Sequence, residues 1–458
     1  MAITDEDTQK HASYTTTILP EIYASQVHAS PKKQSRLSRL WTVPLMAVAL
    51  LLILITPQNP YDHVFVATKL SDPNLFLRTG PFVQHSLTPA QVNALMHIIT
   101  HVTYKQLAQE YVAHMTLDEE LGQLIMAEYY TPTYSDDLET MITKLHAGGV
   151  VMYALQMHTF EQTKNDIAQM QKHAQLPLLI STDEEGGFVE RVQNIYGDRP
   201  GALQTYETGD INNAAKLGHS IAHDLLALGI NEDLAPDVDV QLVDGADQYL
   251  RTWGYTVQSV IQWAGVYMRA VQSDGVIACI KHFPGLGDAS TDAHYGLPVV
   301  NRTRDQLYAV ELAPFKAFIQ SSNKLDNPGM VMPTDVLMPA IDPKLPAELS
   351  PTFINGILRK EFGYDGVVIT DGLYMKGITD KWTVPQAAVM ALNAGNDMIL
   401  GPNGSYEMIQ VLDALKAALQ NGTLSKARVD DAATHIITLK LERHLMLMEP
   451  PQYYGFNA

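Results

Sequence analysis

The chain has 458 residues, and its 50 acidic and 31 basic residues give a formal net charge of −19, which argues against a nucleic-acid backbone as the main partner. Hydrophobic residues make up 46% of the chain, enough for a large buried core, so wholesale disorder is excluded. Because Cys279 is the only cysteine, an intrachain disulfide and a cysteine-rich zinc site are excluded as well.

The first predicted element is an uncharged apolar run at residues 40–56, LWTVPLMAVALLLILIT. As a helix it would be about 25 Å long, close to the hydrocarbon thickness of a bilayer, and it predicts a transmembrane anchor at residues 39–57. Basic residues stand just before the run, and the first one after it is Lys69. This asymmetry predicts a single-pass cell-membrane protein with a cytoplasmic N-terminus and an extracytoplasmic catalytic domain. A cleaved signal peptide is the alternative, but Ile55-Thr56-Pro57 is a poor cleavage site.

Two segments flank the predicted anchor. Residues 1–38 are polar and lack apolar periodicity, so they predict a disordered cytoplasmic tail. Residues 58–115 predict a stalk and helical linker, because prolines punctuate the first part and helical periodicity begins near residue 88. The main domain is predicted over residues 116–448, and residues 449–458 form a C-terminal tail.

Within residues 116–448, short apolar runs alternate with segments of helical periodicity. Continuously apolar strands that alternate with helices predict a parallel sheet covered on both faces. Seven or eight such units over about 330 residues favour an α/β fold of the TIM-like (β/α)8 barrel type. A doubly wound open sheet is the alternative, but no glycine-rich phosphate loop supports it. The expected strands lie within 148–153, 176–182, 230–236, 275–280, 329–334, 366–370 and 396–400, and the expected helices within 159–175, 213–228, 257–272, 304–320 and 385–394.

Charged residues directly follow five of the expected strands. In a barrel, the carboxyl ends of the strands meet at one mouth, where enzymes of this fold place their chemistry. Burying such side chains inside the sheet would be costly, so we expect them to line one polar pocket. The residues are Asp183 and Glu184, Asp237 and Asp239, Lys281 and His282, Asp335, and Asp371.

At these positions the chain resembles the family 3 glycoside hydrolases of the single-domain β-N-acetylglucosaminidase (β-hexosaminidase) type. The most specific block is KHFPGLGDASTDAHYGLPVV at 281–300, supported by residues 346–378 and 176–192. The resemblance implies a retaining exo-glycosidase that hydrolyses terminal β-N-acetylglucosaminides, such as cell-wall or amino-sugar oligosaccharides, by double displacement. It implies no cofactor and no metal. Weaker similarity lies at 115–126, 229–240, 250–254 and 428–440.

The resemblance assigns catalytic roles to three residues. Asp371 in the ITD segment matches the family's nucleophile, although a strand-end aspartate taken alone is more often a helix N-cap. Asp292 and His294 match the Asp-x-His dyad that serves this subgroup as acid and base. The chemistry is reasonable, because a neighbouring carboxylate fixes the tautomer of an imidazole and stabilises its charged form.

By the same resemblance, several residues would bind the terminal sugar. Charged donors and acceptors in fixed positions suit the paired hydroxyl groups of a sugar. Arg191 and Met375 also lie in pocket motifs, but a structural role for Arg191 and a packing role for Met375 stay open. The residues that match hydroxyl-binding positions are Asp183, Arg251, Lys281 and His282.

The chain also departs from the family pattern at three positions. Phe188 stands where an arginine is usual, and Leu286 and Asp335 stand where a histidine is frequent. These departures leave the subsite beyond the terminal sugar, and therefore the natural substrate, undecided. The alternatives are a β-glucosidase or a glycoside phosphorylase on the same barrel, and a non-catalytic wall-binding protein. A carbohydrate is the expected partner in each case, together with the lipid bilayer at residues 40–56.

Overall fold

The structure is a computed structural model that describes residues 102–456, apart from 244, 246–249 and 449–450. The predicted cytoplasmic tail, the predicted anchor and most of the predicted stalk therefore lie outside the described residues. Within the described part of the chain, no helix combines the length and the apolar character that crossing a bilayer requires.

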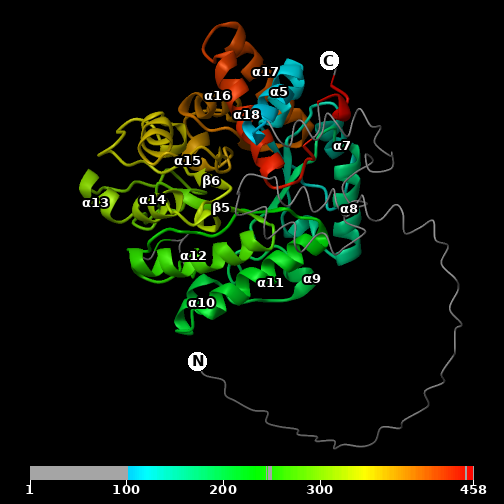
Figure 1. Ribbon diagram of the computed structural model, residues 1–458. Coiled ribbons are helices and arrows are strands. Elements are labelled where there is room, and N and C mark those ends of the chain that lie inside the picture. The colour runs from blue at the N-terminus through cyan, green and yellow to red at the C-terminus, as the bar shows by residue number, and fades with distance from the viewer. Residues whose placement is uncertain (1–101, 244, 246–249, 449–450, 457–458) are drawn as a thin grey trace, which may run out of the picture. The chain divides into compact units, whose positions relative to one another are not determined.

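Eight parallel strands form one curled sheet in the order β7-β6-β5-β4-β3-β2-β1-β8. Ile369, just after β7, and Met398, just before β8, form an isolated parallel bridge, so the two ends of the sheet approach each other. Helices surround the strands (Figure 1), and the arrangement is TIM-like. The strands are β1 (Ile125–Glu128), β2 (Gly149–Val151), β3 (Leu179–Thr182), β4 (Glu232–Asp233), β5 (Ile277–Phe283), β6 (Met330–Pro333), β7 (Val367–Val368) and β8 (Ile399–Asn403).

All seven expected strands are present, including the weak one at 230–236, which contains the two-residue strand β4. The sequence did not predict β1. Only Leu124 separates this strand from the preceding helix α6 (Leu117–Gln123), so the two elements read as one helical segment. With β1 the parallel sheet has its eighth strand, and that strand pairs with both β2 and β8.

Helices follow most strands, and hydroxyl side chains begin many of them. Thr159, Thr256 and Thr383 each accept a backbone N–H in the first turn of the helix that follows. The longer helices are α7 (Asp136–Thr143), α8 (Phe160–His173), α11 (Asn212–Leu228), α12 (Val257–Ser273), α16 (Val384–Ala394), α17 (Gly404–Gln420) and α18 (Lys426–Glu442). The shorter ones are α9 (Gln193–Tyr196), α10 (Ala202–Glu207), α13 (Arg304–Ala309), α14 (Ala313–Ile319), α15 (Lys376–Thr379) and a π-helix (Thr352–Glu361).

The helix expected over 304–320 is two helices in the structure, α13 and α14. Val310 leaves the helical region with φ −126° and ψ −72°. Pro314 lies in the first turn of α14, where its missing N–H costs no helical hydrogen bond. The apolar periodicity therefore identified the helical segment correctly but did not show the break.

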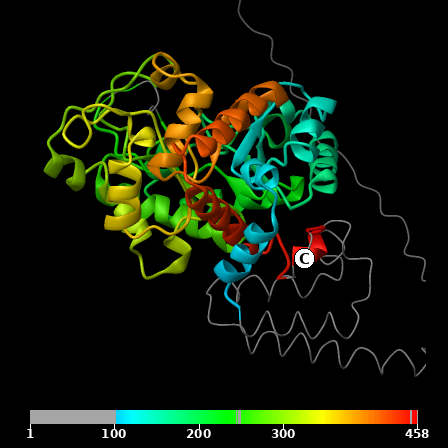
Figure 2. The same ribbon diagram turned by 90° about the horizontal axis from the view of Figure 1, so that it is seen from above.

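Helix α5 (Tyr104–His114) packs along α18, and Figure 2 shows the two side by side. Its buried face carries Leu107, Ala108, Tyr111 and Val112. The Tyr111 ring also lies 5.8 Å, centroid to centroid, from the ring of Tyr454 near the C-terminal end of the described residues. The described part of the predicted linker thus contributes to the packed helical layer.

Candidate active site

A buried ion pair joins the carboxyl ends of β3 and β5. Lys281 Nζ lies 2.6 Å from Asp183 Oδ1 and 2.8 Å from Glu185 Oε1. Burial would lower the pKa of Lys281, but the two carboxylates raise it above its ordinary value. Burial would raise the pKa of Asp183 and of Glu185, but the cations beside each carboxyl hold both values below their ordinary range. All three groups are therefore charged at neutral pH.

Arg251 holds Glu185 from the other side with two parallel hydrogen bonds. Its Nε donates to Glu185 Oε2 at 2.9 Å, and its Nη2 donates to Oε1 at 2.8 Å. The same guanidinium lies 3.3 Å from His282 Nε2 and 3.7 Å from Asp237 Oδ2. Such a bidentate contact fixes both the position and the plane of the guanidinium.

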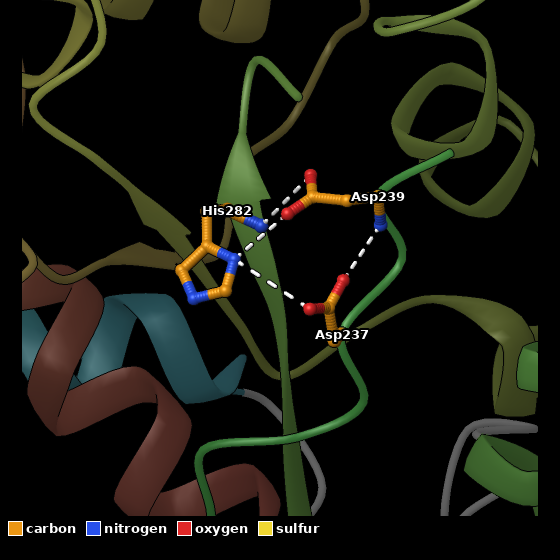
Figure 3. Close-up of side chains that lie close together, drawn as sticks. All are labelled: Asp237, Asp239 and His282. Atoms are coloured by element: carbon orange, nitrogen blue, oxygen red, sulfur yellow. Dashed lines mark hydrogen bonds and ion pairs between the residues drawn. The ribbon is translucent and has the colours of Figure 1, made fainter. Parts of the chain in front are cut away.

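His282 is fixed by the two aspartates that follow β4 (Figure 3). Its Nδ1 lies 2.8 Å from Asp239 Oδ2, and Asp237 Oδ1 accepts the Asp239 backbone N–H at 2.8 Å. Burial would lower the pKa of His282, but Asp239 raises it to about 9. Burial and the charge of Asp239 raise the pKa of Asp237 to about 8. At pH 7 the imidazole is therefore a cation that donates to Asp239, and Asp237 is mostly protonated.

Asp237, Asp239 and His282 offer ligand atoms within 4.8 Å of one another, a spacing that a metal ion could bridge. Here, however, Arg251 supplies positive charge to Asp237, and His282 Nδ1 is already bonded to Asp239. A divalent cation would be repelled by the guanidinium and by the protonated imidazole. These residues therefore fit an ion-pair network better than a metal centre.

Asp371 follows β7, and both of its carboxylate oxygens are held. Oδ1 accepts the backbone N–H of Gly372 at 2.8 Å, and Oδ2 accepts the hydroxyl of Thr334 at 2.8 Å. The residue is partly exposed. Met375, four positions further on, is 4% exposed and donates its backbone N–H to Gly372, so its main role in the structure is packing.

Asp292 and His294 form the predicted pair on the long loop after β5. His294 Nδ1 lies 2.9 Å from Asp292 Oδ1, which also accepts the His294 backbone N–H at 2.8 Å. The imidazole is 55% exposed, whereas the Asp292 side chain is 15% exposed. A partly exposed carboxylate thus orients an imidazole whose Nε2 makes no hydrogen bond to any other described residue.

The loop that carries this pair contacts the segment after Asp371. Gly377 donates its backbone N–H to the carbonyl of Ala293, between the two residues of the pair, at 3.2 Å. The loop also pairs with the segment after β6, because Leu337 donates to Pro298 O at 2.9 Å. The structure therefore brings the two loops together, but it shows no direct contact between His294 and Asp371 among the described residues.

Arg191 borders the ion-pair cluster at a greater distance. Its guanidinium lies 3.9 Å from Asp183 Oδ2 and 5.7 Å from the centroid of the Tyr153 ring. Of the positions that depart from the family pattern, Phe188 is 66% exposed, whereas Leu286 is buried at 1% exposure. Phe188 is thus free to contact a ligand from solvent, and Leu286 packs in the core.

The expectation that every strand-end charge lines the pocket was wrong for several residues. Glu184, Asp239 and Asp335 are completely buried. Glu184 accepts two backbone N–H groups at 2.7 and 3.0 Å, and it pairs with Arg199 Nε at 3.2 Å. Hydrogen bonds and ion pairs of this kind compensate the cost of burial that the prediction treated as prohibitive.

Sequence reasoning missed two carboxyls that belong to the site. Glu185 lay in the quoted DEEGG segment but was not distinguished from its neighbours. Glu128 ends β1, is 2% exposed and accepts the hydroxyl of Tyr153 at 2.9 Å. Burial raises the pKa of Glu128 to about 7, and the nearby charges of Asp183 and Asp371 act in the same direction. No sequence signal pointed to Glu128, because β1 itself was not predicted.

Residues 116–439 match the family model of the glycosyl hydrolase family 3 N-terminal domain. The chain belongs to this family. The match confirms the resemblance carried by the 281–300 block. Among solved structures, this family 3 chain is similar to a β-N-acetylglucosaminidase from Paenibacillus sp. str. FPU-7, with 38% identity and a TM-score of 0.68, over 72% of this chain and 63% of that one.

Two relatives extend the comparison of this family 3 chain. A β-hexosaminidase of Idiomarina loihiensis is 35% identical over 272 residues, which cover 58% of this chain and 79% of that protein. β-Hexosaminidase A of Pseudoalteromonas piscicida is 29% identical over 370 residues, which cover 71% of this chain and 61% of that protein. The chain thus spans less than two thirds of the length of the Pseudoalteromonas protein and of the Paenibacillus structure.

Proposed function

We propose that this family 3 member is a retaining exo-β-N-acetylhexosaminidase that removes terminal β-linked N-acetylglucosamine from cell-wall or amino-sugar oligosaccharides. The observation that carries the proposal is the position of Asp371. Both of its oxygens are held by hydrogen bonds, and its charge acts on the pKa of Glu128 together with the charge of Asp183 from the buried cluster. The relatives named β-hexosaminidase support the choice of substrate class.

The charged cluster would bind the hydroxyl groups of the terminal sugar. Asp183 offers carboxylate oxygens, while Lys281 and Arg251 offer donors whose positions are fixed by their ion pairs. Groups that are already oriented lose little freedom when the sugar binds, so they favour one pose. That pose would present the anomeric carbon to Asp371.

The reaction would proceed in two displacements. In the first, an oxygen of Asp371 attacks the anomeric carbon while the bond to the leaving oxygen breaks and that oxygen takes the Nε2 proton of His294. In the second, His294 Nε2 takes a proton from water, which attacks the anomeric carbon and releases Asp371. Asp292 would stabilise the imidazolium formed in each cycle. The exposed loop must close over the substrate for His294 to reach the leaving oxygen.

We propose also that residues 40–56 anchor the chain in the cytoplasmic membrane, with the catalytic domain on the outer side. The uncharged run and the basic residues before it support this topology. Protease added outside intact cells should then degrade the domain, whereas an N-terminal epitope should be cleaved only after the cells are opened. Protection of the domain in intact cells would contradict the proposal.

The catalytic proposal is tested with the full chain in detergent on paired nitrophenyl glycosides. We expect the N-acetylglucosaminide to be cleaved faster than the glucoside, and Asp371→Asn to lower kcat by about 10³-fold or more. Asp380→Asn, which changes an exposed carboxylate nearby, is the matched control and should be neutral. Undiminished activity of Asp371→Asn would refute the assignment of the nucleophile.

The proton donor is tested in the same assay. His294→Ala should lose about 10²-fold on natural oligosaccharides and far less on substrates with activated leaving groups, because these need no proton at the leaving oxygen. His223→Ala, at an 82% exposed histidine, is the control. Equal losses on both substrates would count against the acid role.

The same assay separates the alternative functions. Faster cleavage of glucosides would favour a β-glucosidase, and a requirement for phosphate would favour a glycoside phosphorylase. Binding without hydrolysis would favour a non-catalytic wall-binding protein.

A further inference from the structure

The hydroxyl of Thr334 makes two contacts with carboxyl groups. It lies 2.8 Å from Asp371 Oδ2 and 3.2 Å from Asp335 Oδ1. A threonine hydroxyl has one proton and two lone pairs, and an ionised carboxylate can only accept. If both carboxyls were ionised, one proton would have to serve both contacts. Sharing one proton weakens both contacts, so the arrangement is stronger if one of the two carboxyls contributes a proton of its own.

Burial distinguishes the two carboxyls. Asp335 is 0% exposed, whereas Asp371 is partly exposed and its other oxygen accepts the Gly372 backbone N–H. A charge on Asp335 would lose its hydration completely, while a charge on Asp371 keeps contact with solvent and with a backbone donor. The proton therefore belongs on Asp335.

A second buried carboxyl, Glu348, interacts with both Asp335 and Asp371. Glu348 lies in a short 3-10 helix (Ala347–Leu349) and is 0% exposed. Burial raises the pKa of Glu348 well above its ordinary value, and the charges of Asp335 and Asp371 act in the same direction, while the backbone N–H of Asp371 opposes them. Two buried carboxyls side by side cannot both ionise at low cost, so this pair retains at least one proton at neutral pH.

Asp335 also lies against the segment that meets the dyad loop. A Cβ added to Gly377 would stand only 1.9 Å from Asp335 Oδ2, so this carboxyl oxygen lies close to the Gly377 backbone. Gly377 in turn donates to the carbonyl of Ala293, between Asp292 and His294. The Asp335 side chain thus lies between the proposed nucleophile and the loop that carries the proposed acid.

We propose that Asp335 is a positioning residue that donates a hydrogen bond to Thr334 Oγ1, so that the Thr334 hydroxyl donates to Asp371 Oδ2. The proposal rests on the nucleophilic role proposed for Asp371. The chain of donors aims the carboxylate at the anomeric carbon. It also stabilises the negative charge that returns to Asp371 when the glycosyl–oxygen bond breaks in the second displacement. Release of the sugar should depend on this chain more than formation of the ester.

The test uses rapid kinetics with a nitrophenyl N-acetylglucosaminide, which separates a burst of nitrophenol from the slower steady state. Asp335→Val removes the donor, whereas Asp335→Asn keeps one in its amide. Thr334→Val removes the hydroxyl that links Asp335 to Asp371, and Thr334→Ser retains it. We expect the two valine variants to slow the steady state about tenfold with a smaller change in the burst rate, and the Asn and Ser variants to restore most of the loss.

The outcomes separate this inference from the proposed function. If Asp371→Asn keeps its activity, the nucleophile is wrong and the chain of donors has no role. If Asp371→Asn is inactive but the valine variants match wild type, the proposed series of hydrogen bonds from Asp335 through Thr334 to Asp371 is wrong, and the proposed function stands. Equal losses in burst and steady state, with no rescue by Asn or Ser, would show a merely structural role and overturn the inference. The Thr334 pair alone decides the matter if the Asp335 variants fail to fold.

Discussion

Replacing Lys440 by methionine should stabilise the protein. Lys440 lies in α18 and is completely buried, and its Nζ donates to Gln123 Oε1 at 2.8 Å. Among the described residues no carboxylate pairs with this ammonium group. Burial lowers the pKa of Lys440 to about 7, so the folded protein has to keep a poorly compensated amine in its core.

The size of the effect follows from the shift in pKa. The folded-state pKa is depressed from 10.5 to about 7, so the folded state binds fewer protons than the unfolded state across that window. Stability therefore rises with pH from about 7 to 10.5, and the cost is complete below pH 7. At about 1.4 kcal/mol per pKa unit, this shift costs at most about 5 kcal/mol. Allowing for relaxation around the side chain, we expect the methionine variant to gain about 2 kcal/mol.

The assay is urea unfolding of the full chain in one detergent at pH 7 and at pH 9.5. The gain of Lys440→Met over wild type should shrink at least twofold at the higher pH, because pH 9.5 lies only one unit below the unfolded-state pKa of 10.5, so keeping the amine neutral in the folded state then costs only about 1.4 kcal/mol. Lys360→Met removes the same charge from an exposed position and should be neutral at both pH values. A destabilised Lys440→Met, or a gain that is equal at the two pH values, would refute the reasoning.

Three further perturbations test other parts of the molecule. Arg251→Lys cannot reproduce the bidentate contact with Glu185, so KM should rise about tenfold or more with a smaller change in kcat, measured by steady-state kinetics. Asp397→Asn removes the completely buried carboxylate that pairs with Arg359, Arg428 and His435, and urea unfolding should show a loss of about 3 kcal/mol. The pKa of Glu128 is raised from 4.5 to about 7, so its favourable contribution is present below pH 4.5 and is lost as the pH rises through 7. Glu128→Gln should therefore flatten the decline in unfolding free energy between pH 5 and pH 8.

Much of the fold could be predicted because buried parallel strands leave a simple signal. The runs at 148–153 and 329–334 are continuously apolar, and each contains a strand. The signal fails where a strand is short and borders a helix, as β1 does, and it weakens where polar side chains lie inside the sheet. In β4 both residues, Glu232 and Asp233, are acidic and completely buried, so apolar content is a poor guide there.

The candidate site was only partly predictable, since sequence shows which charges follow the strands but not which of them meet. Asp183 and Lys281 were predicted together and do pair, because both stand at strand ends that face the same mouth. The contact between Glu185 and Arg251 spans 66 residues and depends on a loop that no periodicity describes. The same limit applies to Thr334, whose role is visible only once β6 and β7 lie side by side.

The neighbouring residues Glu184 and Glu185 show how a turn decides which charge reaches the pocket. Glu184 accepts the backbone N–H groups of the returning chain, while Glu185 pairs with Lys281 and Arg251. Gly186 and Gly187 follow with φ values of 79° and 63°, and a Cβ on Gly186 would stand 2.5 Å from a backbone carbonyl oxygen. Only glycine adopts this turn without strain, and without the turn the returning chain would not reach Glu184. Glu184 would then lose its backbone partners and could no longer stay buried at low cost, so the charge pattern at this strand end depends on two residues that carry no charge.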